Sequence, residues 1–332
     1  MNDDFLTDES AARVWKGLSP KTWIVICESP VRLEFGCDAE GIPSICFGFK
    51  DSDAQDFFGS NVQESGGFYL DNESKINGGR SKIKYRMTET DPGLFYSFSS
   101  DLMRLAKGLG IVTQQECAKI IVGRIKAWQA FMKPSHVGLT PEAELGLFGE
   151  LLILRKWLEL GGVPDSLGGV WTGPMHGAHD FTFRNERAIE VKTTLNDKPL
   201  RVNIDSISQL DHSDPTKLIL VVIKLRETEE GLTLKDLSGK VRALLKSAPL
   251  QMQFDSALLS LGYMVEHPGR ELRRLSEEYL SAFVASSLPR IIRETVPGVV
   301  SVRYQIQLTN ERGEPGGKFE LEDLDKFLNE AI

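Results

Sequence analysis

The stretch 178–194 constrains the fold more than any other part of the chain, because its pattern is that of two short strands joined by a polar turn. Residues 181–183 (FTF) have the composition of a strand, and the polar segment that follows is centred on Asn185, which tolerates turn conformations. In the second strand, apolar residues alternate with Glu190 and Lys192. Side chains of a strand point to opposite faces with period two, so Glu190 and Lys192 share a face with their Cα atoms roughly 6.6 Å apart. The pattern predicts a hairpin that buries its apolar side chains on one side and presents an acid and a lysine on the other.

The length of the turn decides whether a second acid joins this pair. With a loop of about three residues centred on Asn185, Asp180 at the start of the hairpin faces Glu190 directly. With a loop of two residues, Asp180 pairs with Val191 and its carboxylate turns away. The sequence permits both registers.

Asp180 followed by Glu190-Val191-Lys192 resembles the D…(D/E)xK signature of the PD-(D/E)xK nucleases, which share the restriction-endonuclease-like fold. In that family a helix before the hairpin often adds an acid, and Glu150, in an apolar helical segment, takes this place. His179 replaces the proline of the family motif, which is a tolerated variation. The motif resemblance covers residues 141–224, and a looser similarity to the bacterial PD-(D/E)XK motif proteins reaches most of the chain.

This resemblance implies a Mg²⁺-dependent DNA endonuclease that hydrolyses phosphodiester bonds, with Mn²⁺ as a substitute, in a bacterial restriction or phage-defence system. Glu150, Asp180 and Glu190 would hold the metal, Lys192 would assist the attacking water, and Thr194 would line the phosphate path. The implied partners are DNA and other defence-system subunits, such as a methyltransferase or an ATPase, and the protein could form an oligomer. The alternative is a catalytically inactive subunit of the same fold that binds nucleic acid or partner proteins as a scaffold.

The chemistry of these residue types supports the enzyme over the scaffold. Hard divalent cations prefer oxygen ligands and keep several waters, so carboxylates around a strand pair suit them. Such a cation stabilises charge on a phosphoryl group and activates a bound water, and a lysine beside it can orient or deprotonate that water. Glu150 is surrounded in sequence by apolar residues, where an unpaired carboxylate would be costly. A site that has lost its catalytic activity is not expected to keep three acids and a lysine. The acidic net charge of the chain, in contrast, favours the scaffold.

The composition sets wider bounds on the function. The formal net charge of −8 argues against a general nucleic-acid-coating protein, but it is compatible with a nuclease whose metal site gathers acids. The chain has no apolar run of membrane-spanning length, and its acidic start does not resemble a signal peptide. Its four cysteines lack CxxC spacing, which predicts free thiols. We therefore expect a cytoplasmic protein with no membrane partner.

The order of patterns along the chain predicts an α/β protein with a restriction-endonuclease-like core, in which helices flank a mixed sheet. We expect a β-rich N-terminal domain over 1–93, a helical connector over 94–135, and a nuclease-like domain over 136–332 that ends in further strands and a helix. Within the last domain, the continuous apolar run 218–223 suits a central strand that is buried on both faces. Residues 200–204 are expected to form a third strand of the core.

Two other kinds of site have partial signals around the same hairpin. The His179-Asp180 doublet resembles that of HD-domain phosphohydrolases, but the glycines and proline beside it disfavour the helix that such sites require. A zinc site at His176 and His179 lacks a nearby cysteine, so we expect these imidazoles to line a loop that faces DNA. The chain has no Walker loop, so we do not expect it to hydrolyse ATP by itself.

Overall fold

The structure is a computed structural model, and it describes residues 8–61, 68–73, 80–85, 92–110, 112–132, 139–175, 177–196, 199–211, 217–264, 273–291, 299, 301–310, 312 and 319–332. The chain forms two compact units. The first comprises Met1–Gly138 and Leu258–Tyr263, and the second comprises Leu139–Ala257 and Met264–Ile332.

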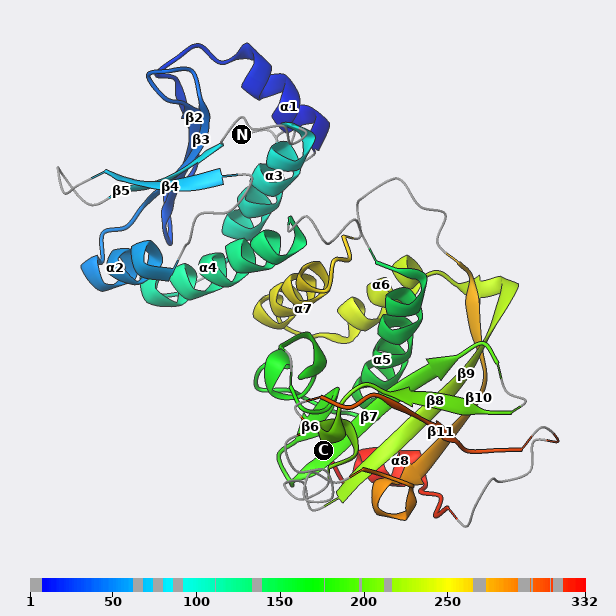
Figure 1. The fold of residues 1–332 in the computed structure, drawn as a ribbon. Helices are drawn as coiled ribbons and strands as arrows, with labels where there is room; N and C mark the ends of the chain where they lie inside the picture. Colours follow the sequence, from blue (N-terminus) through cyan, green and yellow to red (C-terminus); the bar gives the residue numbers. More distant parts are fainter. Residues whose placement is uncertain are drawn as a thin grey trace. The chain divides into compact units, whose positions relative to one another are not determined.

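The first unit is built on an antiparallel five-stranded sheet with the strand order β1-β2-β3-β5-β4 (Figure 1). Its elements in chain order are α1 (Asp8–Gly17), β1 (Trp23–Cys27), β2 (Arg32–Cys37), β3 (Pro43–Gly48), α2 (Ser52–Asn61), β4 (Phe68–Glu73), β5 (Arg80–Tyr85), α3 (Pro92–Gly108) and α4 (Gln114–Phe131). Aromatic side chains hold the helices on the sheet: the ring of Trp15 lies 4.9 Å from that of Phe35, and Phe47 lies 4.9 Å from Phe58. The four cysteines are free thiols, as predicted.

The first unit differs from the prediction in its helices. The expected strands are present, but α1 and α2 also occur in a region that the sequence pattern assigned mainly to strands. By its contacts, the predicted connector, which corresponds to α3 and α4, belongs to the same compact unit as these strands. The division into three domains stays a prediction.

The second unit contains a mixed four-stranded sheet of order β10-β9-β7-β6 and a separate two-stranded sheet of β8 and β11. Its elements are α5 (Pro141–Glu159), the 3₁₀ turns η2 (Leu167–Gly169) and η3 (Gly173–Met175), β6 (Phe181–Phe183), β7 (Arg187–Thr194), β8 (Arg201–Ile204), η4 (Ile207–Leu210), β9 (Lys217–Leu232), α6 (Leu234–Leu244), α7 (Ala248–Ser260), whose last three residues belong to the first unit, β10 (Leu275–Val284), η5 (Ala285–Ser287), β11 (Tyr304–Gln307) and α8 (Leu324–Asn329). β7 and β9 are parallel, and β6 and β10 flank them antiparallel. The predicted central strand is therefore confirmed in β9.

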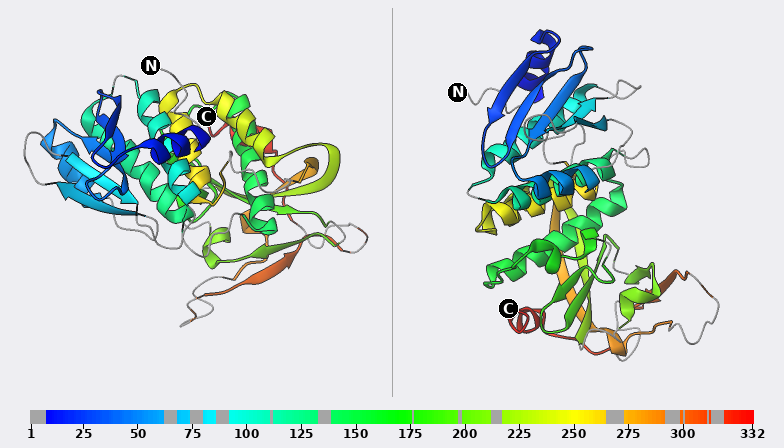
Figure 2. Two further views of the ribbon diagram at one scale, coloured as in Figure 1. Left: turned by 90° about the horizontal axis from the view of Figure 1, so that it is seen from above. Right: turned by 90° about the vertical axis from the view of Figure 1, so that its left-hand side faces the viewer.

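Helix α5 covers one face of the four-stranded sheet (Figures 1 and 2). It begins at the N-cap Thr140, whose side chain accepts from the backbone N–H of Ala143, as the Thr-Pro sequence predicts. Its close approach to β7 depends on Gly149, because an added Cβ would lie only 2.2 Å from Cγ2 of Thr193. This contact places the next residue of the helix, Glu150, beside the hairpin.

The ribbon of β8 and β11 covers the opposite face. Its buried residues Val202, Ile204 and Ile306 pack in one apolar cluster with Leu220 and Val222 of β9. Strand β8 therefore exists as predicted. The expectation that it belongs to the core sheet is wrong, because it pairs with β11, which lies about a hundred residues later in the chain.

Among the described helices, none has both the length and the apolar composition that crossing a membrane requires.

Candidate active site

The β6–β7 hairpin brings Asp180 opposite Glu190. Phe181 pairs with Ile189, and the loop between the strands has three residues, 184–186. The last of these, Glu186, has a φ of 57°. A residue in this left-handed conformation is what completes a three-residue hairpin loop. The three-residue alternative is thus confirmed, and the register that turned Asp180 away is excluded.

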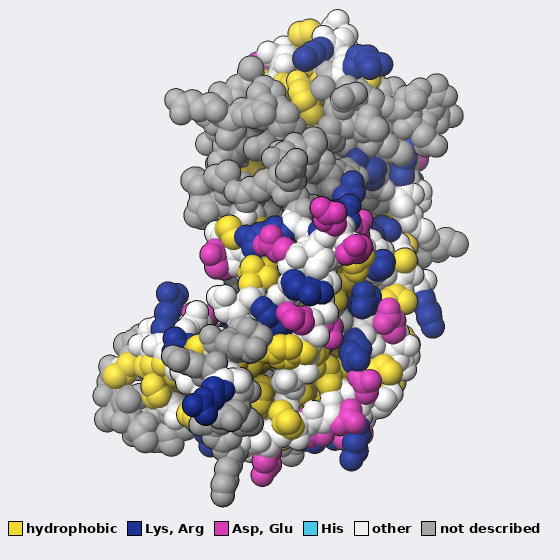
Figure 3. Space-filling view, turned by 90° about the vertical axis from the view of Figure 1, so that its right-hand side faces the viewer, with side chains coloured by type: hydrophobic (Ala, Val, Ile, Leu, Met, Phe, Trp, Pro, Cys, Tyr) yellow, Lys and Arg dark blue, Asp and Glu magenta, His cyan; other side chains and the backbone are white. Residues whose placement is uncertain are grey.

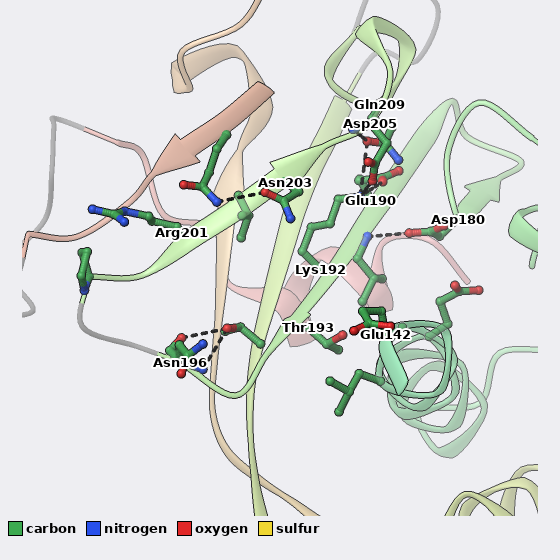
Figure 4. Close-up of a pocket in the computed structure, with 18 residues that line it drawn as sticks. Glu142, Asp180, Glu190, Lys192, Thr193, Asn196, Arg201, Asn203, Asp205 and Gln209 are labelled. Atoms are coloured by element: carbon green, nitrogen blue, oxygen red, sulfur yellow. Dashed lines mark hydrogen bonds and ion pairs between the residues drawn. The ribbon is translucent and has the colours of Figure 1, made fainter. Parts of the chain in front are cut away.

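Glu190 and Lys192 lie on the same face of β7, and their side chains are in contact. The Nζ of Lys192 lies 3.1 Å from Oε1 of Glu190, 3.3 Å from Oε1 of Gln209 and 3.8 Å from Oδ2 of Asp205 (Figure 4). Oε1 of Gln209 also accepts from the backbone N–H of Asp205 at 2.8 Å, which fixes the orientation of its amide. The lysine ammonium is therefore held from two sides, by β7 itself and by the turn that follows β8.

Asp180 is fixed by the backbone around it. Its Oδ2 accepts from the N–H of Val191 at 2.7 Å, and its carbonyl accepts from the N–H groups of Thr172 and Gly173 at 2.9 and 3.1 Å. These bonds hold the carboxylate at the edge of β7, beside Glu190.

Glu150 reaches the same place from α5. Its Oε2 accepts a 2.6 Å hydrogen bond from the indole Nε1 of Trp171. A Cβ added at Gly173 would lie 3.0 Å from this oxygen and 3.2 Å from Oδ1 of Asp180. The two carboxylates therefore border one small space, which the missing side chain of Gly173 leaves open.

The three acids are costly to ionise in this setting. Burial and the neighbouring charge of Asp180 raise the pKa of Glu150 to about 8, against the opposing effects of Trp171 and Lys192. Burial likewise raises the pKa of Asp180, although the N–H of Val191 and Lys192 oppose it. Glu190 is only 1% exposed, and burial and Asp180 raise its pKa well above the usual range, despite its contact with Lys192. One ammonium therefore compensates only one of three gathered carboxylates.

These residues line a cleft of about 710 Å³ between α5, β7 and the β8–β11 ribbon (Figure 4). Glu150, Asp180, Glu190 and Lys192 lie at one side of it, and exposed polar residues of the ribbon form another wall. The sequence predicted a strand face that presents the acid and the lysine. In the structure Glu190 is buried, and it lies with Lys192 in the lining of a cleft.

The donor set fits a hard divalent cation in type and charge. All three acids supply oxygen ligands, and Oε2 of Glu190 is buried without a hydrogen-bond partner among the described residues. Among the described residues, however, there is no group of three or more His, Cys, Asp or Glu side chains whose present arrangement could hold a metal ion. The acids are neighbours, but their oxygens are directed to Trp171, Val191 and Lys192.

Several residues of the site were not anticipated from the sequence. Gln209, Asp205 and Gly173 belong to turns, and Trp171 forms an isolated β-bridge with Phe181, so the directions of these side chains follow no repeating pattern. The only local signal was the polar composition of 205–209 after a short strand.

Two other expectations need qualification. His179 is 8% exposed and is not among the residues that line the cleft, so the expectation that it lines a DNA-facing loop is wrong, while His176 lies outside the described residues. Thr194 does line the cleft, but its hydroxyl donates to the carbonyl of Asn196 and accepts from the N–H of the same residue.

Comparison with known proteins yields one family match. No curated protein and no solved structure matches the chain significantly. The family model described as "Putative PD-(D/E)XK family member, (DUF4420)" matches residues 27–309. This match includes both hairpin acids, the lysine and the helix acid, and it suggests a nuclease-type activity. Because the match spans most of its length, the chain belongs to this PD-(D/E)XK family.

Proposed function

We propose that this protein is a Mg²⁺-dependent DNA endonuclease that hydrolyses phosphodiester bonds. The observation that carries the proposal is the local charge at one side of the cleft, where the carboxylates of Glu150, Asp180 and Glu190 gather beside the single ammonium of Lys192. A divalent cation supplies the two positive charges that this arrangement lacks. Such a cation, when bound, polarises a phosphoryl oxygen and lowers the pKa of a water.

The side chains divide the work by position. Glu150, Asp180 and Glu190 would hold the cation through their oxygens, with Asp180 kept in place by its bond from the Val191 N–H. Lys192 would stand beside the attacking water and either orient it or neutralise the charge that develops on the phosphoryl oxygens. Gln209 would keep the ammonium from collapsing fully onto Glu190, because it offers a second acceptor at 3.3 Å.

The surface charge suits a nuclease that obtains part of its DNA affinity from partner subunits. Among the described side chains on the face drawn in Figure 3, Lys and Arg are interspersed with Asp and Glu and form no continuous basic band. Broad phosphate contact is the usual source of non-specific affinity. We therefore place the protein, in line with its resemblance to bacterial PD-(D/E)XK motif proteins, in a restriction or phage-defence system with partner subunits such as a methyltransferase or an ATPase.

A cleavage assay on supercoiled, linear duplex and single-stranded DNA, with Mg²⁺, Mn²⁺ or a chelator, tests the proposal. The wild type should cut only with metal. Lys192→Ala should retain cation binding, measured by calorimetry, yet cut about a hundredfold more slowly or worse. Asp180→Asn should lose both cation binding and cleavage, because it removes a charged ligand.

Glu142→Gln is the matched control, since Glu142 is an exposed acid on the same helix and lines the same cleft. It should cut like the wild type. Undiminished cleavage by Lys192→Ala and Asp180→Asn would place the chemistry elsewhere in the chain.

A scaffold is the second candidate, and the lack of a ready-made coordination shell among the described residues favours it. A scaffold would cut no DNA form under either metal, and both variants would bind DNA or partner proteins as the wild type does. Metal-dependent cleavage by the wild type eliminates this candidate.

A further inference from the structure

The outer face of the β8–β11 ribbon carries a compact set of polar side chains. In each strand, buried and exposed residues alternate, so that Val202 and Ile306 enter the apolar core while their neighbours point outward. The exposed residues form two cross-strand pairs: Arg201 opposite Gln307 and Asn203 opposite Gln305. One arginine and three amides thus occupy the four outward positions, and none of the four is acidic or apolar.

These side chains are ordered by each other but keep free hydrogen-bonding groups. Gln305 Nε2 donates to Oδ1 of Asn203 at 3.0 Å, and Arg201 Nε donates to Oε1 of Gln307 at 3.0 Å. Among the described residues, Nδ2 of Asn203, Oε1 of Gln305 and the terminal nitrogens of Arg201 have no further partner. The pairs therefore present donors and acceptors with a fixed orientation, as a surface for hydrogen-bond recognition requires.

The chemistry favours base edges over phosphates. A phosphate track is built mainly from Lys and Arg, whereas uncharged amides pair with adenine N6 and N7, and arginine pairs with guanine O6 and N7. Charge is confined to the ends of the ribbon. Arg201 lies at one end, and Arg303, which is 80% exposed and 3.9 Å from Asp205, precedes β11 at the other. This pattern suits a surface that contacts bases in its middle and phosphates at its ends.

The dimensions also suit a duplex. Two paired strands lie roughly 4.8 Å apart, and a two-stranded ribbon fits the major groove, which is about 12 Å wide. Arg201 and Asn203 are two residues apart on one strand, a step of roughly 6.6 Å that is close to two base-pair rises of about 3.4 Å each. The ribbon could therefore contact about three successive base pairs.

The ribbon is continuous with the candidate active site. Arg201, Asn203 and Gln305 line the same cleft as Asp180 and Lys192. Figure 4 shows Arg201 and Asn203 on β8, across the cleft from Asp180. At the near end of the ribbon, Asp205 lies 3.8 Å from Nζ of Lys192. A duplex seated on the ribbon would pass directly beside the acids and the lysine.

We propose that the outer face of the β8–β11 ribbon reads base edges in the major groove of a DNA duplex and so sets where the DNA is cut, a role that rests on the proposed nuclease function. Asn203 and Gln305 select the bases at the centre of the contact, and Arg201 selects a guanine or holds a phosphate at its edge.

Affinity selection from a library of duplexes with random sequence, carried out in chelator, tests this inference without any cleavage. The full-length protein should enrich a short sequence of about three to four base pairs. Asn203→Ala and the double variant Asn203→Ala/Gln305→Ala should lose roughly 10-fold to 100-fold of the preference at one or two positions, while affinity for unselected DNA changes little. Both side chains are exposed, so the variants should keep the wild-type melting temperature.

Asn196→Ala is the matched control. It removes the same amide from the same cleft but from outside the ribbon, and the hydrogen bonds of Asn196 to Thr194 use its backbone. It should select the wild-type sequence. The inference is overturned if no sequence is enriched, if the ribbon variants select the same sequence, or if single-stranded libraries are enriched in place of duplexes.

The two proposals fail separately. A protein that selects a sequence through the ribbon but cuts no DNA with metal would refute the nuclease and support the ribbon. A protein that cuts DNA, but whose selection is unaltered by the ribbon variants, would refute the ribbon alone.

Discussion

Replacing Glu150 by Gln should make the metal-free protein more stable, which is the opposite of what removing a buried, hydrogen-bonded group usually does. The pKa of Glu150 is raised to about 8 in the fold, mainly by burial and by Asp180. A carboxyl with a raised pKa contributes stability that is fully present below its unfolded pKa, near 4.5, and lost as the pH rises to about 8. At pH 8.5 the ionised side chain is therefore a cost to the folded state.

The size of this cost follows from the shift. At 1.36 kcal/mol per pKa unit, the shift corresponds to at most roughly 5 kcal/mol. Glutamine keeps an oxygen for the indole N–H of Trp171, but that bond loses its charge assistance, which offsets about 1 kcal/mol. We expect a net stabilisation of about 2–4 kcal/mol at pH 8.5, or a melting temperature raised by roughly 5–10 °C. The difference should shrink as the pH falls toward 4.5.

Divalent metal should offset much of this difference in stability. A cation at a hundred times its Kd stabilises the wild type by about 2.7 kcal/mol, because it binds only the folded state. The Gln variant has one ligand charge fewer and should gain much less. Thermal unfolding by circular dichroism at pH 5, 7 and 8.5, in chelator and in Mg²⁺, measures both effects on the same samples.

Glu142→Gln controls for the loss of an acid from the same helix. Its side chain is exposed, so neither the pH-dependent gain nor the loss of the metal response is expected. A Glu150→Gln variant that melts at or below the wild type at pH 8.5 in chelator would contradict the charge cost assigned to Glu150. An equal gain from Mg²⁺ in both proteins would instead remove Glu150 from the ligand set.

Three further substitutions test the packing of the cleft. Gly173→Ala should weaken cation binding at least tenfold by calorimetry, because its methyl would crowd both bordering carboxylates, whereas Gly146→Ala, in the same cleft with nothing within 4 Å, should bind like the wild type. Gly149→Ala should destabilise the protein by about 1–3 kcal/mol in urea unfolding, because the added Cβ would lie 2.2 Å from the methyl group of Thr193. Adding Thr193→Ser, which removes this methyl group, should recover much of the lost stability. Gln209→Leu should slow cleavage with little change in cation affinity, because it removes an acceptor of the lysine ammonium; equal losses in both would assign Gln209 to the metal.

The hairpin and its acid–lysine pair were predictable because they depend on local rules. The alternation of Ile189 and Val191 with Glu190 and Lys192 places the last two on one face of any strand that they form. A three-residue turn was one of two permitted choices, and the backbone at Glu186 realises it. The cap at Thr140 and the buried run in β9 were equally local, since each is encoded within a few consecutive residues.

The helix α2 was missed for a tertiary reason. Its sequence, SDAQDFFGSN, is poor in strong helix formers, and its hydrophobic periodicity is weak. The helix is stabilised by Phe58, which packs against Phe47 and Phe49 of the sheet region. Local propensity cannot anticipate a helix that owes its stability to such contacts.

What the sequence determined by itself was a set of candidate residues, and the face of its own element on which each of them lies. Only the tertiary structure decided that Glu150 stands beside Asp180, that Gln209 holds Lys192, and that the ribbon of β8 and β11 closes the cleft. Each of these depends on segments far apart in the chain, and β8 alone gives no sign of a partner that begins at Tyr304. Periodicity fixes the direction of a side chain within its own element, whereas the group that it meets there depends on how distant elements pack.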